Sequence, residues 1–134
     1  MTRWMLDTNT VSVAGRGRSP SVDAKLRGNF GANALCVSVI TEGEILFGLA
    51  RKPAATKLAD AMRSMFSQLT VLAWTSETAQ SYGRLRETLR TNGYALTPLN
   101  TLIAAHALSI EATLVTSDRA FRYVPGLAIE DWND

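Results

Sequence analysis

Short apolar runs alternate with longer amphipathic stretches along this chain of 134 residues. The apolar runs predict strands, and several are apolar at consecutive positions, which is typical of strands buried inside a parallel sheet. The longer stretches repeat apolar residues every three or four positions, which predicts helices. We expect strands at 4–6, 35–40, 69–72, 112–116 and 127–129, and helices at 8–14, 20–28, 41–50, 54–66, 76–92 and 101–110. This alternation predicts an α/β fold with a central, mainly parallel sheet.

The composition is that of one ordinary domain covering residues 1–134. A single cysteine, Cys36, excludes an internal disulfide and lies in an apolar run, so we expect a buried strand thiol. There is no signal-peptide pattern and no apolar stretch long enough for a membrane span, so we expect a cytoplasmic protein. The net charge is only +2, but eleven of the fourteen basic residues are arginine. This composition fits a nucleic-acid or other acidic partner, and equally the codon bias of a GC-rich genome.

Acidic residues follow two of the predicted strands. Asp7 comes directly after the first strand, and Asp118 follows the strand at 112–116 by two residues. The carboxyl ends of parallel strands meet at one edge of the sheet, where ligands bind in α/β proteins. Carboxylates gathered there repel each other unless a cation holds them, which points to a divalent metal site. Both residues are also good helix N-caps, and the two roles are compatible.

Two further polar residues have structural explanations of their own. Thr41 and Glu44 fit a capping box at the start of a helix, and Asn100 fits an N-cap of the alanine-rich helix that follows it. His106 is the only histidine, which argues against a histidine-ligated zinc site or a catalytic histidine pair. We expect it to be packed inside its helix.

Five motifs in this order resemble those of PIN-domain ribonucleases of the VapC toxin type. Each motif alone is weak, but together they span nearly the whole chain. They are Met5-Leu6-Asp7-Thr8-Asn9; the T-x-x-E-hydrophobic-x-x-G pattern at 41–48; the Pro-hydrophobic-Asp segment with its Ile-Ala-x-His-Ala helix, here at 98–107; Leu114-Val115-Thr116-Ser117-Asp118; and Glu130-Asp131-Trp132.

The resemblance implies a PIN-like α/β/α sandwich and a metal-dependent endoribonuclease. Its catalytic residues would be Asp7, Glu44, Asn100 and Asp118, with Mg²⁺ or Mn²⁺ held by the cluster and ligated by Asp7, Asn100 and Asp118. Supporting roles would fall to Thr8, Asn9, Thr116 and Ser117. Hard oxygen ligands of this kind select Mg²⁺ or Mn²⁺ over zinc. For RNA backbone contacts we single out Arg16 and Arg18 in the basic loop at 15–20.

The resemblance also implies partners and a substrate. Members of the family are toxins of type II toxin–antitoxin pairs, form homodimers and are silenced by a VapB-type antitoxin. The antitoxin would lay an apolar helix along the toxin and point a basic side chain at the acidic pocket. Members with a similar C-terminal half resemble enzymes that cut initiator tRNA in its anticodon loop, which makes structured RNA, and tRNA in particular, the expected substrate.

One position departs from the family pattern, because Asn100 stands where the family has Asp. The amide keeps one acceptor oxygen but removes a full charge, which weakens metal binding. Either the change is engineered to disarm a toxin, which the intact motifs favour, or it is natural and activity has been reduced. We therefore expect this chain to be weakened or inactive, with its fold and partner contacts retained.

Two rival interpretations remain to be weighed. A non-catalytic PIN-fold module that acts through protein contacts is the alternative. A phosphatase of the haloacid-dehalogenase type is set aside, because it needs Asp at position 9, where Asn9 stands, and a lysine beyond Lys57.

Overall fold

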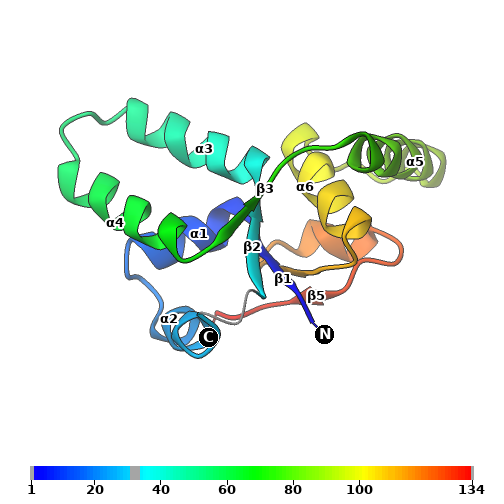
Figure 1. Ribbon diagram of the computed structural model, residues 1–134. Helices are drawn as coiled ribbons and strands as arrows, with labels where there is room; N and C mark the ends of the chain where they lie inside the picture. Colours follow the sequence, from blue (N-terminus) through cyan, green and yellow to red (C-terminus); the bar gives the residue numbers. More distant parts are fainter. Residues whose placement is uncertain (1, 31–33, 134) are drawn as a thin grey trace.

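The computed structural model describes residues 2–30 and 34–133, which form a five-stranded parallel sheet covered by helices (Figure 1). The strand order is β3-β2-β1-β4-β5, and every neighbouring pair is parallel. The strands are β1 (Trp4–Leu6), β2 (Leu35–Ser38), β3 (Thr70–Leu72), β4 (Thr113–Val115) and β5 (Ile129–Glu130). The predicted α/β fold with a parallel sheet is confirmed.

Helices cover both faces of the sheet. Figure 1 shows α1, α2 and α4 on one side and α5 and α6 on the other, while α3 packs against both α1 and α6. The helices are α1 (Thr8–Gly15), α2 (Pro20–Arg27), α3 (Val39–Ala50), α4 (Thr56–Ser67), α5 (Ser76–Asn92) and α6 (Pro98–Ser109), with a short 3₁₀ helix η1 (Arg119–Tyr123) after β4. None of the helices in the described ranges has the length and apolar character needed to cross a membrane.

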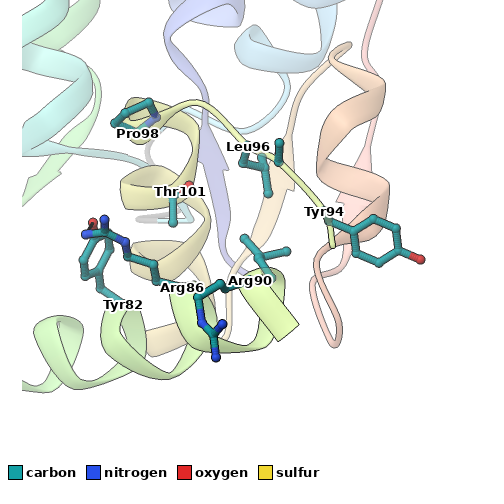
Figure 2. Close-up of a pocket in the computed structure, with 9 residues that line it drawn as sticks. Tyr82, Arg86, Arg90, Tyr94, Leu96, Pro98 and Thr101 are labelled. Carbon is teal, nitrogen blue, oxygen red and sulfur yellow. Dashed lines mark hydrogen bonds between the residues drawn. The ribbon is translucent and has the colours of Figure 1, made fainter. Parts of the chain in front are cut away.

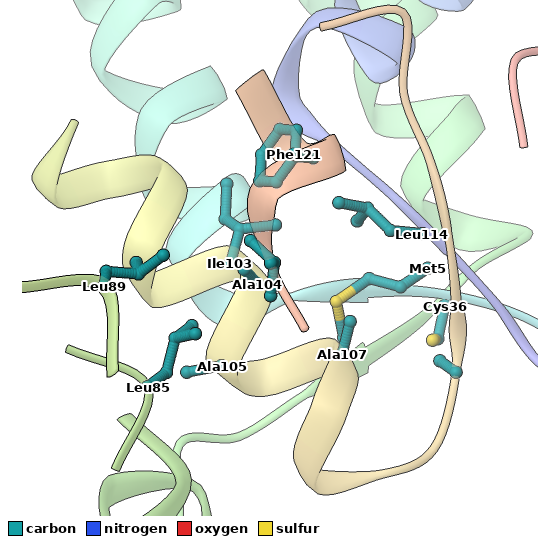
Figure 3. Close-up of a cluster of buried hydrophobic side chains, with 12 residues drawn as sticks. Met5, Cys36, Leu85, Leu89, Ile103, Ala104, Ala105, Ala107, Leu114 and Phe121 are labelled. Carbon is teal, nitrogen blue, oxygen red and sulfur yellow. The ribbon is translucent and has the colours of Figure 1, made fainter. Parts of the chain in front are cut away.

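The alternation of side chains along the strands divides the core into two clusters. Met5 and Leu114 point to the α5–α6 side, where they pack with Phe121 and Ile103 (Figure 3). Their chain neighbours, Leu6 among them, point to the other side and pack with residues of α1, α2 and α4. Cys36 belongs to the first cluster, so the expectation of a buried strand thiol is confirmed.

Two helices begin earlier than the sequence suggested. Ser38 caps α3 by accepting a hydrogen bond from the backbone N–H of Ile40, so Thr41 already lies within the helix and the capping box with Glu44 does not form. Thr97 caps α6 and Pro98 occupies its first position, so the expected capping role of Asn100 is also wrong. The backbone N–H of Asn100 instead donates to Thr97 Oγ1 over 3.1 Å. The Asn100 side chain therefore does not cap α6.

Candidate metal centre

A polar hollow lies at the carboxyl edge of the sheet, where β1 and β4 run side by side. This is the point at which the chain reverses the direction of strand addition, and ligands of open α/β sheets bind there. Side chains from the end of β1, the first turns of α1 and α6, and the segment after β4 line the hollow. They are Asp7, Thr8, Asn9, Ser12, Asn100, Ser117 and Asp118.

Asp7 is the buried carboxylate of this hollow, with 5% of its surface exposed. Its Oδ1 accepts a hydrogen bond of 2.8 Å from the backbone N–H of Thr10, so it caps α1 as expected. Its Oδ2 accepts one of 2.6 Å from the hydroxyl of Thr116 on the neighbouring strand end. Burial raises the pKa of the Asp7 carboxyl above its ordinary value, and the charge of Asp118 adds to this, although the hydrogen bonds from Thr116 and Thr10 oppose it. A cation in the hollow would favour the charged form of Asp7 and so oppose this rise in its pKa.

Asp118 follows β4, the parallel neighbour of β1, and lines the same hollow. Its side chain is exposed. Its Oδ1 caps η1 through the backbone N–H of Ala120 at 2.9 Å, which confirms the expected cap. Its Oδ2 accepts a hydrogen bond of 3.1 Å from Nδ2 of Asn100. Its own backbone N–H donates to Thr116 Oγ1 over 3.0 Å, so a single threonine links the Asp7 carboxylate to the backbone of Asp118. The supporting hydrogen bonds expected of Thr116 are therefore present.

Glu44 is placed differently from the other three predicted catalytic residues. It is half-buried on α3 and does not line the hollow. It lies one turn beyond Thr41, whose hydroxyl accepts a hydrogen bond of 3.3 Å from Thr8, a residue of the hollow. Residues three apart on a helix are neighbours, so Glu44 lies beside the site without being part of its lining.

The two arginines expected to contact RNA lie outside the hollow, at the end of α1. Both are exposed, and Arg16 Nε donates to the hydroxyl of Ser12 over 3.3 Å. Because Ser12 lines the hollow, Arg16 lies close to its rim. The structure places Arg18 two residues further along the chain, where α1 has already ended.

Sequence reasoning missed the contribution of the C-terminal segment. The hydroxyl of Ser117 donates to Oδ1 of Asp131 over 2.9 Å and accepts a hydrogen bond from Nδ2 of Asn133. Hydrogen bonds from Asn133 and Ser117 lower the pKa of the Asp131 carboxyl, so it stays charged beside the hollow. Nothing local in the sequence signals this long-range contact; only the motif at 130–132 hinted that these residues matter.

The donors that line the hollow are suited to a hard divalent cation. Two carboxylates, two amides and three hydroxyls line the hollow, and Mg²⁺ is commonly held by one or two carboxylates with water completing its shell. The Asn100 amide turns its NH₂ group to Asp118, so it would have to rotate to present its oxygen. Within residues 2–30 and 34–133, no three Asp, Glu, His or Cys side chains gather closely enough to hold a metal ion. The arrangement therefore fits Mg²⁺ or Mn²⁺ at a two-carboxylate site.

Comparison with known protein families gives one match over most of the chain. The PIN domain model matches residues 4–127. The chain is 31% identical over 133 residues to the tRNA(fMet)-specific endonuclease VapC of Salmonella typhimurium, covering 98% of this chain and 99% of that protein. It is 28% identical over 131 residues to ribonuclease VapC2 of Rickettsia felis, covering 97% and 98% of the two chains.

Solved structures give the same picture of the fold. VapBC2 from Rickettsia felis, bound to a DNA fragment from its promoter, superposes with a TM-score of 0.92 at 26% identity, over 98% of this chain and all of that one. DNA-bound VapBC from Salmonella typhimurium superposes with a TM-score of 0.91 at 30% identity, over 98% and 99% of the two chains.

Proposed function

The chain belongs to the PIN domain family, and on this premise we propose that it is the toxin of a VapBC-type toxin–antitoxin pair, built on a metal-dependent endoribonuclease site. The observation that carries the proposal is the meeting of Asp7, Asn100 and Asp118 in one hollow, although the first two are 93 positions apart in the sequence. The names of its relatives support RNA as the substrate class, and one of them supports initiator tRNA. We propose a single catalytic domain over residues 1–134 that acts as a homodimer.

The residues of the hollow have distinct roles in this proposal. Asp7, Asp118 and the amide oxygen of Asn100 would hold Mg²⁺ or Mn²⁺, with Glu44 acting from the flank of the site. When bound by these residues, such an ion would supply Lewis acidity at the phosphodiester and would make water a better nucleophile. Thr116 fixes the rotamer of Asp7 through its 2.6 Å hydrogen bond and thereby sets where the buried negative charge points. Arg16 and Arg18 would neutralise backbone phosphates at the rim.

Asn100 weakens this site. A carboxylate at the same place would add a unit charge facing the cation, and a unit charge pair 4 Å apart is worth about 1 kcal/mol in water and about 4 kcal/mol in a partly buried site. We therefore propose that the Asn100 form cleaves RNA slowly or not at all.

Replacing Asn100 by aspartate tests both the nuclease function and the weakening of the site by Asn100. Asn100→Asp should gain Mg²⁺-dependent cleavage of transcribed initiator tRNA, followed on a denaturing gel. The matched control is the double variant Asn100→Asp with Asp118→Asn, which has the same net charge as the parent chain and should gain nothing. If Asn100→Asp stays inactive with Mg²⁺ and with Mn²⁺, while remaining folded, the non-catalytic alternative is favoured over the nuclease.

An apolar groove between α3 and α4 supports an antitoxin partner. Leu46, Leu49, Met62 and Phe66 line it, and Leu46 is 57% exposed. We propose that an apolar helix of a VapB-type antitoxin covers this groove and directs a basic side chain toward Asp7. Leu46→Asp should abolish co-purification with the antitoxin, whereas Leu46→Met should preserve it; retention by Leu46→Asp would contradict the assignment of this groove.

A further inference from the structure

A second hollow, of about 330 Å³, lies next to the candidate metal centre. Pro98 and Thr101 in the first turn of α6 line it, while Asn100 in the same turn lines the metal centre. Its opposite wall is a stripe of α5, with Tyr82, Arg86 and Arg90 four residues apart (Figure 2). A molecule that extends away from the metal centre across this turn of α6 would therefore enter the second hollow.

The wall formed by α5 is positively charged. Arg90 is paired with Glu87, but Arg86 forms no ion pair within the part of the chain that the structure describes. Its guanidinium lies 6.0 Å from the centre of the Tyr82 ring and donates one hydrogen bond to the Tyr82 hydroxyl at 3.1 Å. A guanidinium has five N–H donors in a fixed fork, so four remain to bind an anion. Among residues 2–30 and 34–133, no acidic side chain lines this hollow.

An exposed aromatic pair stands at the far end of the same hollow. Tyr94 and Tyr123 are stacked with ring centres 4.7 Å apart, and they are 44% and 54% exposed. Figure 2 shows Tyr94 pointing away from Tyr82 and Arg86, toward the segment that carries η1. Tyr123 ends η1, the same short helix that Asp118 caps. Exposed aromatic faces beside a free arginine are the two elements that bind single-stranded nucleic acid without reading its sequence.

We propose that this hollow is an RNA subsite, which holds single-stranded nucleotides next to the phosphate that lies at the metal centre. Arg86 binds a backbone phosphate, and the Tyr94–Tyr123 pair stacks a base. The proposal rests on the nuclease function proposed above and extends it, because it gives the enzyme a preference for unpaired RNA through stacking rather than through base-edge contacts.

Equilibrium binding of a fluorescein-labelled single-stranded RNA of about 12 nucleotides tests the subsite. Anisotropy is measured with the full chain in EDTA, so that no cleavage occurs, over a series of salt concentrations. Arg86→Gln should flatten the slope of log K against log salt by about 0.7, the value for one phosphate of a single strand. The matched control is Arg51→Gln, directly after the end of α3. The Arg51 guanidinium also lies over an aromatic ring, that of Phe47 at 5.7 Å, and this variant should leave the slope unchanged.

The aromatic pair is tested in the same assay. Tyr94→Ala should weaken binding roughly five- to 150-fold, the range for the loss of one base–aromatic stack, and Tyr94→Phe should restore it. Parent-like binding and slope in both Arg86→Gln and Tyr94→Ala would overturn the subsite and leave the nuclease proposal standing. If the parent chain does not bind the RNA, the subsite proposal falls, while the nuclease proposal is decided separately by the cleavage assay with Asn100→Asp. If Tyr94→Ala instead converts a dimer to a monomer by light scattering, with RNA affinity unchanged, the surface joins two copies of the chain and the RNA assignment is wrong.

Discussion

The hydrogen bond between Asn100 and Asp118 predicts that the restored carboxylate destabilises the metal-free protein. In Asn100→Asp, the donor Nδ2 is replaced by an oxygen that faces Oδ2 of Asp118, now 3.1 Å away. Two like charges at that distance repel by about 1 kcal/mol in water, and Asp118 is exposed, so the water value applies. The lost hydrogen bond to a charged acceptor costs about 1.5 kcal/mol more. We therefore expect a decrease of about 2.5 kcal/mol in the free energy of unfolding in EDTA.

Urea unfolding followed by circular dichroism measures this difference, and Asn100→Ala separates its two parts. The alanine variant loses the hydrogen bond without gaining a charge, so it should be destabilised by only about 1.5 kcal/mol. The additional loss in Asn100→Asp should shrink as salt screens the repulsion.

Mg²⁺ should reverse the order of stabilities. The added unit charge faces a doubly charged ion, so even at the water value it contributes about 2 kcal/mol, or roughly 30-fold in affinity. Asn100→Asp should therefore be stabilised by Mg²⁺ far more than the parent chain, because an ion that binds only the folded state shifts unfolding by mass action. Equal stability of Asn100→Asp and the parent in EDTA, together with equal responses to Mg²⁺, would refute the proposed geometry of the site.

Three further predictions concern residues that hold the site in place. Thr116→Val keeps the side-chain shape but removes the hydroxyl that donates to Asp7, so urea unfolding should show a loss of about 1–3 kcal/mol; a neutral result would mean that this bond does not support Asp7. Burial lowers the pKa of His106, so the folded protein binds fewer protons than the unfolded chain, and stability should fall as the pH drops below about 6.5, by up to about 1.4 kcal/mol per pH unit. His106→Gln should remove that pH dependence, and an unchanged profile would assign it to another group. Phe121→Ala should lower the free energy of unfolding by about 3–5 kcal/mol, because this ring of η1 is fully buried in the cluster that includes residues of α6. A decrease below about 1 kcal/mol in thermal or urea unfolding would show that the cluster is loosely packed.

The sheet and the two acidic strand ends could be predicted because their signals are local. Consecutive apolar residues marked β1, β2 and β4, and the parallel arrangement then required Asp7 and Asp118 to lie at one edge. His106 was expected to be packed, and it is 1% exposed, with Nδ1 2.7 Å from the hydroxyl of Ser38. The type and order of the elements follow from such patterns without knowledge of the tertiary contacts.

The starts of α3 and α6 could not be located so well, for two physical reasons. Val39 and Ile40 are β-branched and continue the apolar run of β2, so they favour a strand locally, whereas the structure places them in the first turn of α3. In α6, Thr97 followed by proline is itself a good helix start, but Asn100 offered a competing cap. This error matters for the site. The sequence predicted that the Asn100 side chain would cap α6, whereas in the structure it donates a hydrogen bond to Asp118.

The contacts around Ser117 illustrate the limit of local signals. Asp131 and Asn133 reach this residue only because β5 pairs with β4, which places the C-terminal segment beside the end of β4. No spacing along the chain reveals that contact, and it becomes visible only when the sheet order is known.

The amide at position 100 also links two segments of the hollow without a metal ion. In a site with three carboxylates, the cation holds together the segments that carry them. Here the Asn100 amide donates directly to Asp118 and so joins α6 to the start of η1 without an ion. Thr116 joins Asp118 to Asp7 in the same way, through one hydroxyl that donates to a carboxylate and accepts from a backbone N–H. These neutral donors oppose the repulsion between the two carboxylates, so we expect the hollow to keep its shape without a metal ion. The surfaces formed by α3, α4 and α5 lie outside this network, and we therefore expect partner binding and catalysis to be separable by a single substitution at position 100.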